Sequence, residues 1–195
     1  MTERSIQAGA APTVVVKAGV SVTIKGVDGE RVTAQTSGRW GLQVKARKET
    51  IEVQMGGSGE VLVPAGASVK VYAGKNAEIV GIHGTVVAVA GLNLSVKGAC
   101  RLGQASAGGA MSIDCRALEA QDVTFNAGSD LSFHVQELAS ARIRVNDIGG
   151  YWEARMDSGE VSVFLKSGGD VTLVTDQPVQ ALPPHYVLGR IEKPA

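Results

Sequence analysis

One stretch constrains the fold of this chain more than any other, because short alternating segments follow one another between residues 123 and 175. They read Val-Thr-Phe, Leu-Ser-Phe-His-Val, Ala-Arg-Ile-Arg-Val, Tyr-Trp-Glu-Ala-Arg-Met, Glu-Val-Ser-Val-Phe-Leu and Val-Thr-Leu-Val-Thr, with turn residues between them. Within the segments apolar residues alternate with polar ones, as Ile143 and Val145 do with Arg142 and Arg144. This period of two predicts β-strands with one buried face and one wet face.

The alternating segments recur at a nearly constant spacing. If Val123, Ala141 and Glu160 start successive units, the period is roughly 18 to 19 residues, with two short strands in each unit. One unit cannot stand alone, because ordering its backbone costs about 1 to 2 kcal/mol per residue. Stacking on neighbouring units makes up the difference. The pattern therefore predicts an all-β fold, a single-stranded, mainly parallel β-solenoid (β-helix-like) with a β-rich N-terminal cap.

An antiparallel sandwich is the structural alternative, because short alternating strands also fit it. The regular spacing and the variety of the turns favour the solenoid. The predicted divisions are a flexible tail over 1–12, a β-rich lead-in or N-terminal cap over 13–59, solenoid coils over 60–176, and a C-terminal cap and tail over 177–195. The lead-in is expected to cover pairing edges that an open solenoid end would expose.

Charge and hydropathy limit the partners. The 195 residues include nineteen basic and nineteen acidic side chains, so the formal charge is zero, and no segment gathers a strong basic run. This pattern indicates no nucleic-acid partner and no anionic-membrane partner. The first residues lack the apolar core of a signal peptide, and no stretch is long enough to span a bilayer. The expectation is a cytoplasmic protein without membrane insertion.

The chain offers little catalytic chemistry, and we predict no catalytic residue, no metal site and no cofactor. His83, His134 and His185 lie far apart, with no second ligand at metal-site spacing. Most carboxylates fall at or near predicted turns, where solvation explains them. Cys100 and Cys115 are expected to be reduced and partly buried thiols, with a disulfide as the alternative.

One surface patch combines cations with aromatic rings on neighbouring predicted strands. Its members are Arg142, Arg144, Tyr151, Glu153, Arg155 and Phe164. Such a mixture suits an acidic sugar or a partner protein. Ordinary solvated strand faces with Arg-Glu pairs explain it as well or better.

Several segments together resemble the bacterial "putative adhesin" family of β-solenoid domains. They are Val-Val-Val-Lys-Ala-Gly, Val-Thr-Ile-Lys-Gly, Val-Leu-Val-Pro-Ala-Gly-Ala-Ser-Val-Lys-Val, Ala-Glu-Ile-Val-Gly-Ile-His-Gly-Thr-Val, Asp-Ser-Gly-Glu-Val-Ser-Val and Ser-Gly-Gly-Asp-Val-Thr-Leu. The resemblance covers roughly residues 13–175. It implies an adhesive role and a surface or secreted location, and it brings no catalytic residues.

Three functional hypotheses follow from the pattern. The leading one is a non-enzymatic structural or interaction protein that presents rigid sheet faces to itself, as a homo-oligomer, or to another protein. A carbohydrate-binding module with a polysaccharide partner is the alternative. A polysaccharide-cleaving enzyme comes third, and it requires carboxylates from adjacent coils to pair on one face.

Overall fold

The structure is a computed structural model, and it describes most of the chain. The described residues are 1–37, 41–118, 122–129, 131–137, 140–148, 152–156, 160–167, 171–175, 179–181 and 189–192, with side chains described for 1–37, 41–98, 100–116 and 126–129. The described elements are all strands, β1 to β20, which confirms the all-β prediction. None of these elements is a helix that could cross a bilayer.

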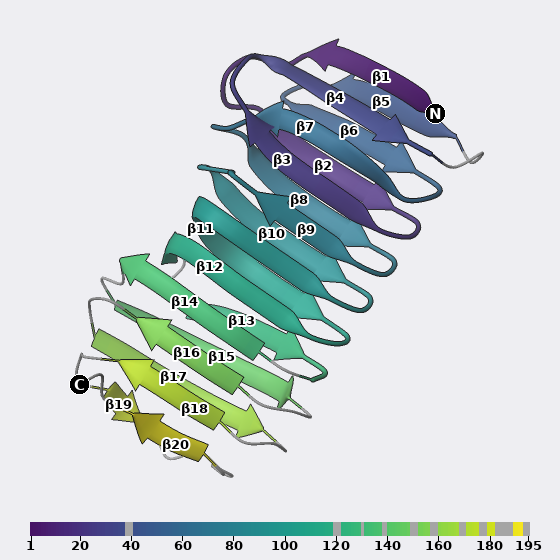
Figure 1. The fold of residues 1–195 in the computed structure, drawn as a ribbon. Coiled ribbons are helices and arrows are strands. Elements are labelled where there is room, and N and C mark those ends of the chain that lie inside the picture. Colours follow the sequence, from purple (N-terminus) through teal and green to yellow (C-terminus); the bar gives the residue numbers. More distant parts are fainter. Residues whose placement is uncertain are drawn as a thin grey trace.

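The strands form two ladders that stack along one axis (Figure 1). In spatial order the first ladder contains β5 (Leu42–Arg47), β6 (Thr50–Met55), β2 (Thr13–Ala18), β8 (Ser68–Ala73), β10 (Thr85–Ala90), the second half of β11 (Leu94–Ala107), β13 (Asp122–Ala127), β15 (Ser140–Ile148), β17 (Glu160–Ser167) and β19 (Val179–Ala181).

The second ladder contains β1 (Thr2–Gln7), β4 (Arg31–Thr36), β7 (Gly59–Pro64), β3 (Val22–Val27), β9 (Ala77–Val80), the first half of β11, β12 (Met111–Leu118), β14 (Leu131–Glu137), β16 (Trp152–Met156), β18 (Val171–Thr175) and β20 (Gly189–Glu192). The long strand β11 passes from the second ladder to the first and joins them.

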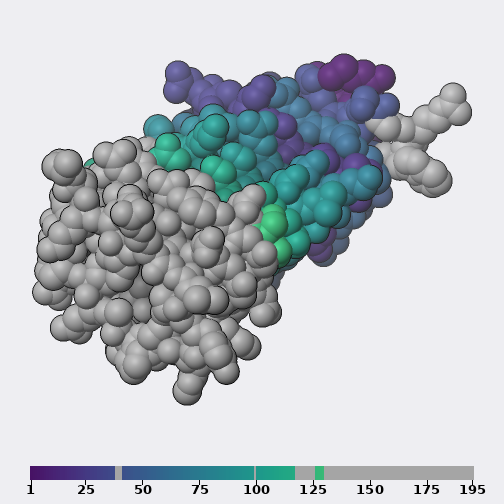
Figure 2. Space-filling view, turned by 60° about the horizontal axis from the view of Figure 1, so that its bottom comes forward, coloured from purple at the N-terminus to yellow at the C-terminus, as the bar shows by residue number. Residues whose placement is uncertain are grey.

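Both ladders are mixed. Strand β5 runs antiparallel to β6, and β4 runs antiparallel to both β1 and β7, whereas the pairs that follow are parallel. The antiparallel strands all lie at the N-terminal end of the stack (Figure 1), which is the purple and blue end of the space-filling view (Figure 2). Antiparallel strands can reverse through short turns, and parallel strands need a longer return through the opposite ladder.

The spatial order of the strands differs from their order in the chain. Strand β2 pairs with β6 on one side and β8 on the other, and β3 pairs with β7 and β9. The lead-in predicted over 13–59 is therefore divided, with β2 and β3 inside the stack and β4 and β5 at its end. Alternation along a strand identifies its buried face but not its partners.

The start of the chain also differs from the predicted flexible tail. Thr2–Gln7 forms β1, whose backbone pairs with β4 along its length. Ile6 packs partly buried against the core, and the Gln35 carboxamide donates to Glu3 at 2.6 Å. A tail assignment from polar composition misses this strand, because backbone pairing does not depend on apolar side chains.

The core lies between the two ladders and is filled with small and branched side chains. Val14 and Val16 of β2 are fully buried, and so are Ile24 of β3 and Val71 of β8. In the second ladder Ile79 stands in register between Ile24 and Val96. Burial of these alternate residues stabilises each strand against its neighbours by roughly 1.5 to 3 kcal/mol per large side chain.

Candidate functional site

The predicted surface patch is divided between the ladders. Arg144 of β15 pairs in register with Phe164 of β17, in the first ladder, and Arg142 lies on the same strand as Arg144. Glu153 and Arg155 instead lie on β16, which pairs with β14 and β18 in the second ladder.

The remaining patch residue, Tyr151, lies outside the described residues. The backbone register thus brings three of the predicted residues together and separates two others from them. These two lie on β16 because the chain moves to the opposite ladder after β15.

The outer face of the first ladder, over β5, β6, β2, β8, β10 and the second half of β11, is strongly cationic. We call it the cationic face. Its exposed cations are Lys17, Lys45, Arg47, Lys70 and Arg101. On these strands, all described, the only carboxylate is Glu52. Since the whole chain is formally neutral, positive charge is concentrated on this face.

Strand register explains this concentration. Lys17 is an outward residue of β2 between the buried Val16 and Ala18, and it pairs with Gln54 on β6 and with Tyr72 on β8. Parallel strands in register place such outward side chains in rows across the ladder, about 4.7 to 4.9 Å apart.

The single carboxylate of the face is already paired. Glu52 Oε2 lies 3.1 Å from Nε of Arg47 on the neighbouring strand. Among the described side chains, neither Lys17 nor Lys70 lies within ion-pair distance of a carboxylate. These two ammonium groups are therefore available to an external anion.

A shallow groove of about 970 Å³ crosses the cationic face. Lys17, Lys70, Tyr72, Gln43 and Gln54 contribute to its walls. Tyr72 is 44% exposed, which makes it the exposed aromatic residue among the described side chains. A ring in that position offers an apolar surface bordered by cations and carboxamides.

The outer face of the second ladder is balanced in charge. Glu60 forms an ion pair with Lys25, and hydrogen bonding to Glu60 together with its negative charge raises the pKa of Lys25. Glu60 and Glu78 lie on the two strands that flank Thr23, and the Thr23 hydroxyl donates to Glu78 at 3.5 Å. Two carboxylates thus lie on one face on either side of β3, and one of them is neutralised by a lysine.

A second hollow, of about 590 Å³, runs along the turns that lead from the first ladder to the second. We call these turns the turn stack. In it Ser21 N–H donates to Ser58 Oγ, and Asn76 N–H donates to Ser21 Oγ, both at 3.4 Å. Asn76 Oδ1 then accepts from Asn93 N–H at 3.2 Å. The side-chain oxygens of the turn residues Ser58, Ser21 and Asn76 thus already accept hydrogen bonds from neighbouring backbone groups.

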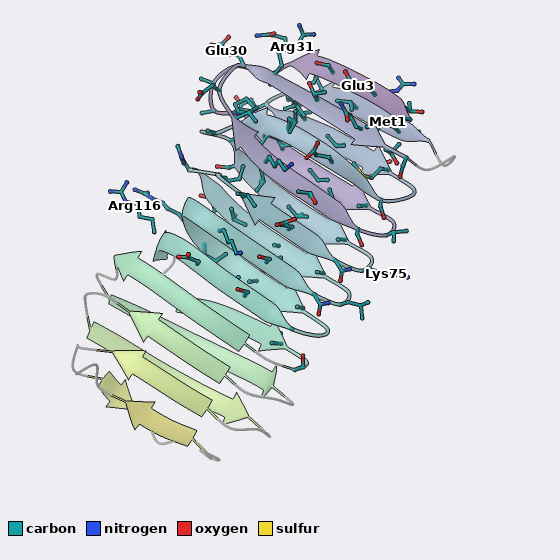
Figure 3. The ribbon with its side chains drawn as sticks, viewed as in Figure 1. Met1, Glu3, Glu30, Arg31, Lys75 and Arg116 are labelled. Carbon is teal, nitrogen blue, oxygen red and sulfur yellow. The ribbon has the colours of Figure 1, made fainter. Side chains whose placement is uncertain are left out.

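Glycines keep the turns of this stack close together. Gly74, Gly91 and Gly108 occupy equivalent positions, and each donates its N–H to a carbonyl at the end of the neighbouring strand, at 2.9 to 3.2 Å. A Cβ on Gly91 would meet the carbonyl oxygen of Gly74, and one on Gly108 would meet that of Gly91, far inside contact distance. Lys75 projects from the same turn as Gly74, on the opposite edge of the ribbon from Arg116 (Figure 3).

The two cysteines are buried free thiols that are hydrogen-bonded to each other. The hydrogen bond to Cys100 raises the pKa of Cys115, and burial raises it further. The same hydrogen bond lowers the pKa of Cys100, and burial opposes that shift.

The predicted histidines form no centre in the described structure. His83 is exposed, and the side chains of His134 and His185 lie outside the described set. Within the described ranges, no three His, Cys, Asp or Glu side chains gather closely enough to hold a metal ion.

Sequence reasoning missed Lys17, Lys70 and Tyr72. The alternation in Thr-Val-Val-Val-Lys-Ala and Ser-Val-Lys-Val-Tyr-Ala places all three residues on outward positions. The sequence does not show that these two segments are neighbours, so the residues could not be assembled into one site.

Comparison with known proteins finds similarity to solved structures only. No family model matches the sequence, and no curated protein matches it. A "putative adhesin" from Parabacteroides merdae aligns over 100% of this chain and 96% of its own, with a TM-score of 0.51 and 9% identity.

Two further solved structures align at lower TM-scores. A "putative adhesin" from Parabacteroides distasonis aligns over 98% of this chain and 96% of its own (TM-score 0.38, 13% identity). A "putative cell adhesion protein" from Clostridium sporogenes aligns over 98% and 92% (TM-score 0.32, 9% identity). The structural neighbours are thus named as adhesins or a cell adhesion protein.

Proposed function

We propose that this chain is a non-enzymatic, adhesin-like interaction protein whose cationic face binds a partner at a cell surface. The observation that carries the proposal is the concentration of cations around Tyr72 on one face of a chain with no net charge. Complementary charge steers a partner to such a face, and an exposed ring supplies contact area.

The proposed architecture is a β-solenoid in which each coil contributes one strand to each ladder. In the middle coils, equivalent residues 17 positions apart are hydrogen-bonded, such as Ser68 with Thr85 and Asn93 with Ala110. In this proposal β1, β4 and β5 cap the N-terminal end and residues 177–195 cap the other. A stack of this kind holds its outward side chains in fixed rows, which lowers the entropy lost on binding.

Binding to whole cells tests this function. Fluorescently labelled protein is incubated with bacterial cells and with cultured epithelial cells, and bound fluorescence is measured by flow cytometry. The double variant Lys17→Gln/Lys70→Gln should bind several-fold less, because both unpaired ammonium groups of the groove are lost. Lys97→Gln, on the opposite ladder, is the matched control and should bind normally. Equal binding by the double variant and the unmodified chain, or no binding to either cell type, would overturn the proposal.

Self-assembly is the second candidate function. In the described pairings, β1 and β5 each have one neighbouring strand, so each keeps an edge that another chain can pair with. Light scattering over a concentration series should then show a mass that grows with concentration. Phe164→Ser should weaken assembly if the first ladder supplies the contact, and a strict monomer at every concentration would exclude this candidate.

A further inference from the structure

We propose that the cationic face binds an acidic polysaccharide, with Tyr72 stacked on a sugar ring and Lys17 and Lys70 contacting the polymer's carboxylates. This inference rests on the proposed function and names the ligand class of its binding face. The groove of about 970 Å³ across β5, β6, β2 and β8 is the site.

The strand register places two lysines next to Tyr72 on the outer face of the first ladder. Lys17 is the direct register neighbour of Tyr72 across the β2–β8 pair, and Lys70 precedes Tyr72 by two residues on the same outward face. A sugar ring presents apolar C–H groups on its face and polar groups around its rim. The Tyr72 ring can pack on the apolar face of the sugar, and the two lysines can pair with carboxylates on the rim of the sugar.

The groove continues from Lys17 with neutral hydrogen-bonding groups. Gln54 pairs with Lys17 on one side and with Gln43 on the other, so the three outward side chains form one row. Each carboxamide supplies both donors and an acceptor, which fits hydroxyl groups that also donate and accept. A row of this composition indicates a hydroxyl-rich ligand with spaced charges.

The charge of the face selects an anionic ligand over a neutral one. Glu52, its only carboxylate, is neutralised by Arg47, so it does not repel an approaching anion. The positive groups recur along the stack, with Lys45 beyond Lys17 on one side and Arg101 on the other. A linear polymer with repeating charge can contact several of them at once.

Single-stranded nucleic acid is the competing polyanion, and the face is less suited to it. Such strands bind where successive bases stack on successive aromatic residues. Tyr72 is the exposed ring among the described residues, and the outward position next to it in its row is Val89. One ring between spaced lysines fits one sugar of a polymer better than a run of bases.

The test is titration calorimetry of the full chain with polygalacturonate, neutral dextran and oligo-dT at two salt concentrations. Polygalacturonate should bind and weaken as salt rises, and dextran should not bind. Tyr72→Ala should lower the affinity for polygalacturonate about tenfold, since the contact area of a packed aromatic ring is worth on the order of 1.4 kcal/mol. Tyr72→Phe should keep most of the affinity, and Lys17→Gln/Lys70→Gln should lower both the affinity and its salt dependence.

Circular dichroism melts of the same variants serve as the folding control, and Lys97→Gln is the charge control. The inference is overturned if no polygalacturonate binds, if oligo-dT binds as tightly, or if Tyr72→Ala binds unchanged. Cell binding that still depends on Lys17 and Lys70 would then leave the proposed function standing with another ligand. Loss of both kinds of binding would remove the proposed function as well.

Discussion

The side-chain oxygen Oδ1 of Asn93 accepts a hydrogen bond from the backbone N–H of Ala110, 3.1 Å away in the next turn of the turn stack. Asn76 Oδ1 accepts from Asn93 N–H in the same way. In the turns before these, the acceptors at the equivalent position are the hydroxyl oxygens of Ser21 and Ser58. The next residue at this equivalent position is Ala110, which has no side-chain oxygen to act as an acceptor. Hydrogen bonds from backbone N–H groups to side-chain oxygens thus link successive turns of the turn stack, and Asn93 is the last residue to supply such an oxygen.

Asn93→Ala should destabilise the protein by about 0.5 to 1.5 kcal/mol, because Ala110 N–H loses its acceptor. Denaturant unfolding followed by circular dichroism measures the loss. Asn93→Asp should retain most of the stability, since a carboxylate oxygen also accepts, and Lys75→Ala in the preceding turn should be neutral. A neutral Asn93→Ala would show that water replaces the lost acceptor.

Gly91→Ala should destabilise the protein by about 1 to 3 kcal/mol or more, because overpacking forces neighbouring groups apart. The added Cβ would overlap the carbonyl oxygen of Gly74 on the adjacent turn. Gly41→Ala is the matched control, since a Cβ there meets nothing within 4 Å. Thermal melts of the two variants should differ clearly, and similar melts would mean that the turns can separate without cost.

Ile79→Ala should lower the unfolding free energy by about 2 to 5 kcal/mol through the cavity it leaves. Ile79 is 1% exposed and stands between Ile24 and Val96 in the second ladder. Val80→Ala, on the outward side of the same strand, should have a much smaller effect. Equal losses from both variants would contradict the assignment of the inner face.

The two cysteines should be nearly inert in the folded protein. Both are buried, and a raised pKa keeps the Cys115 thiol protonated, whereas alkylation requires the thiolate. Iodoacetamide labelling followed by mass spectrometry should therefore be slow in native buffer and fast in denaturant. Rapid labelling of either residue without denaturant would indicate local opening between β11 and β12.

The sequence predicts strand positions well and strand neighbours poorly. Alternation in segments such as Thr-Val-Val-Val-Lys-Ala is enough to identify Val14 and Val16 as buried residues. The same alternation leaves the pairing partner open, since any apolar face of similar length fits the pattern. The placement of β2 beside both β6 and β8 is therefore a property of the folded chain.

The same holds for the candidate site: the sequence predicts which of its residues face outward but not which of them are neighbours. Lys17 and Tyr72 are each predictable as outward residues, but the strand pairing that sets them side by side joins segments far apart in the chain. Arg142 and Arg155 were grouped because their segments are close in sequence, and the structure assigns them to different ladders. Nearness along the chain is a poor guide here, because most successive strands from β6 onward lie in opposite ladders.

The position of β2 and β3 between later strands has a consequence for how the protein is made. The N-terminal part of a chain leaves the ribosome first, so this rung emerges before any of its four partners. Both of its edges stay open until β6 to β9 have been synthesised. The stack must then grow outward from a rung in its interior, and the nascent chain carries unpaired strand edges until that rung is enclosed.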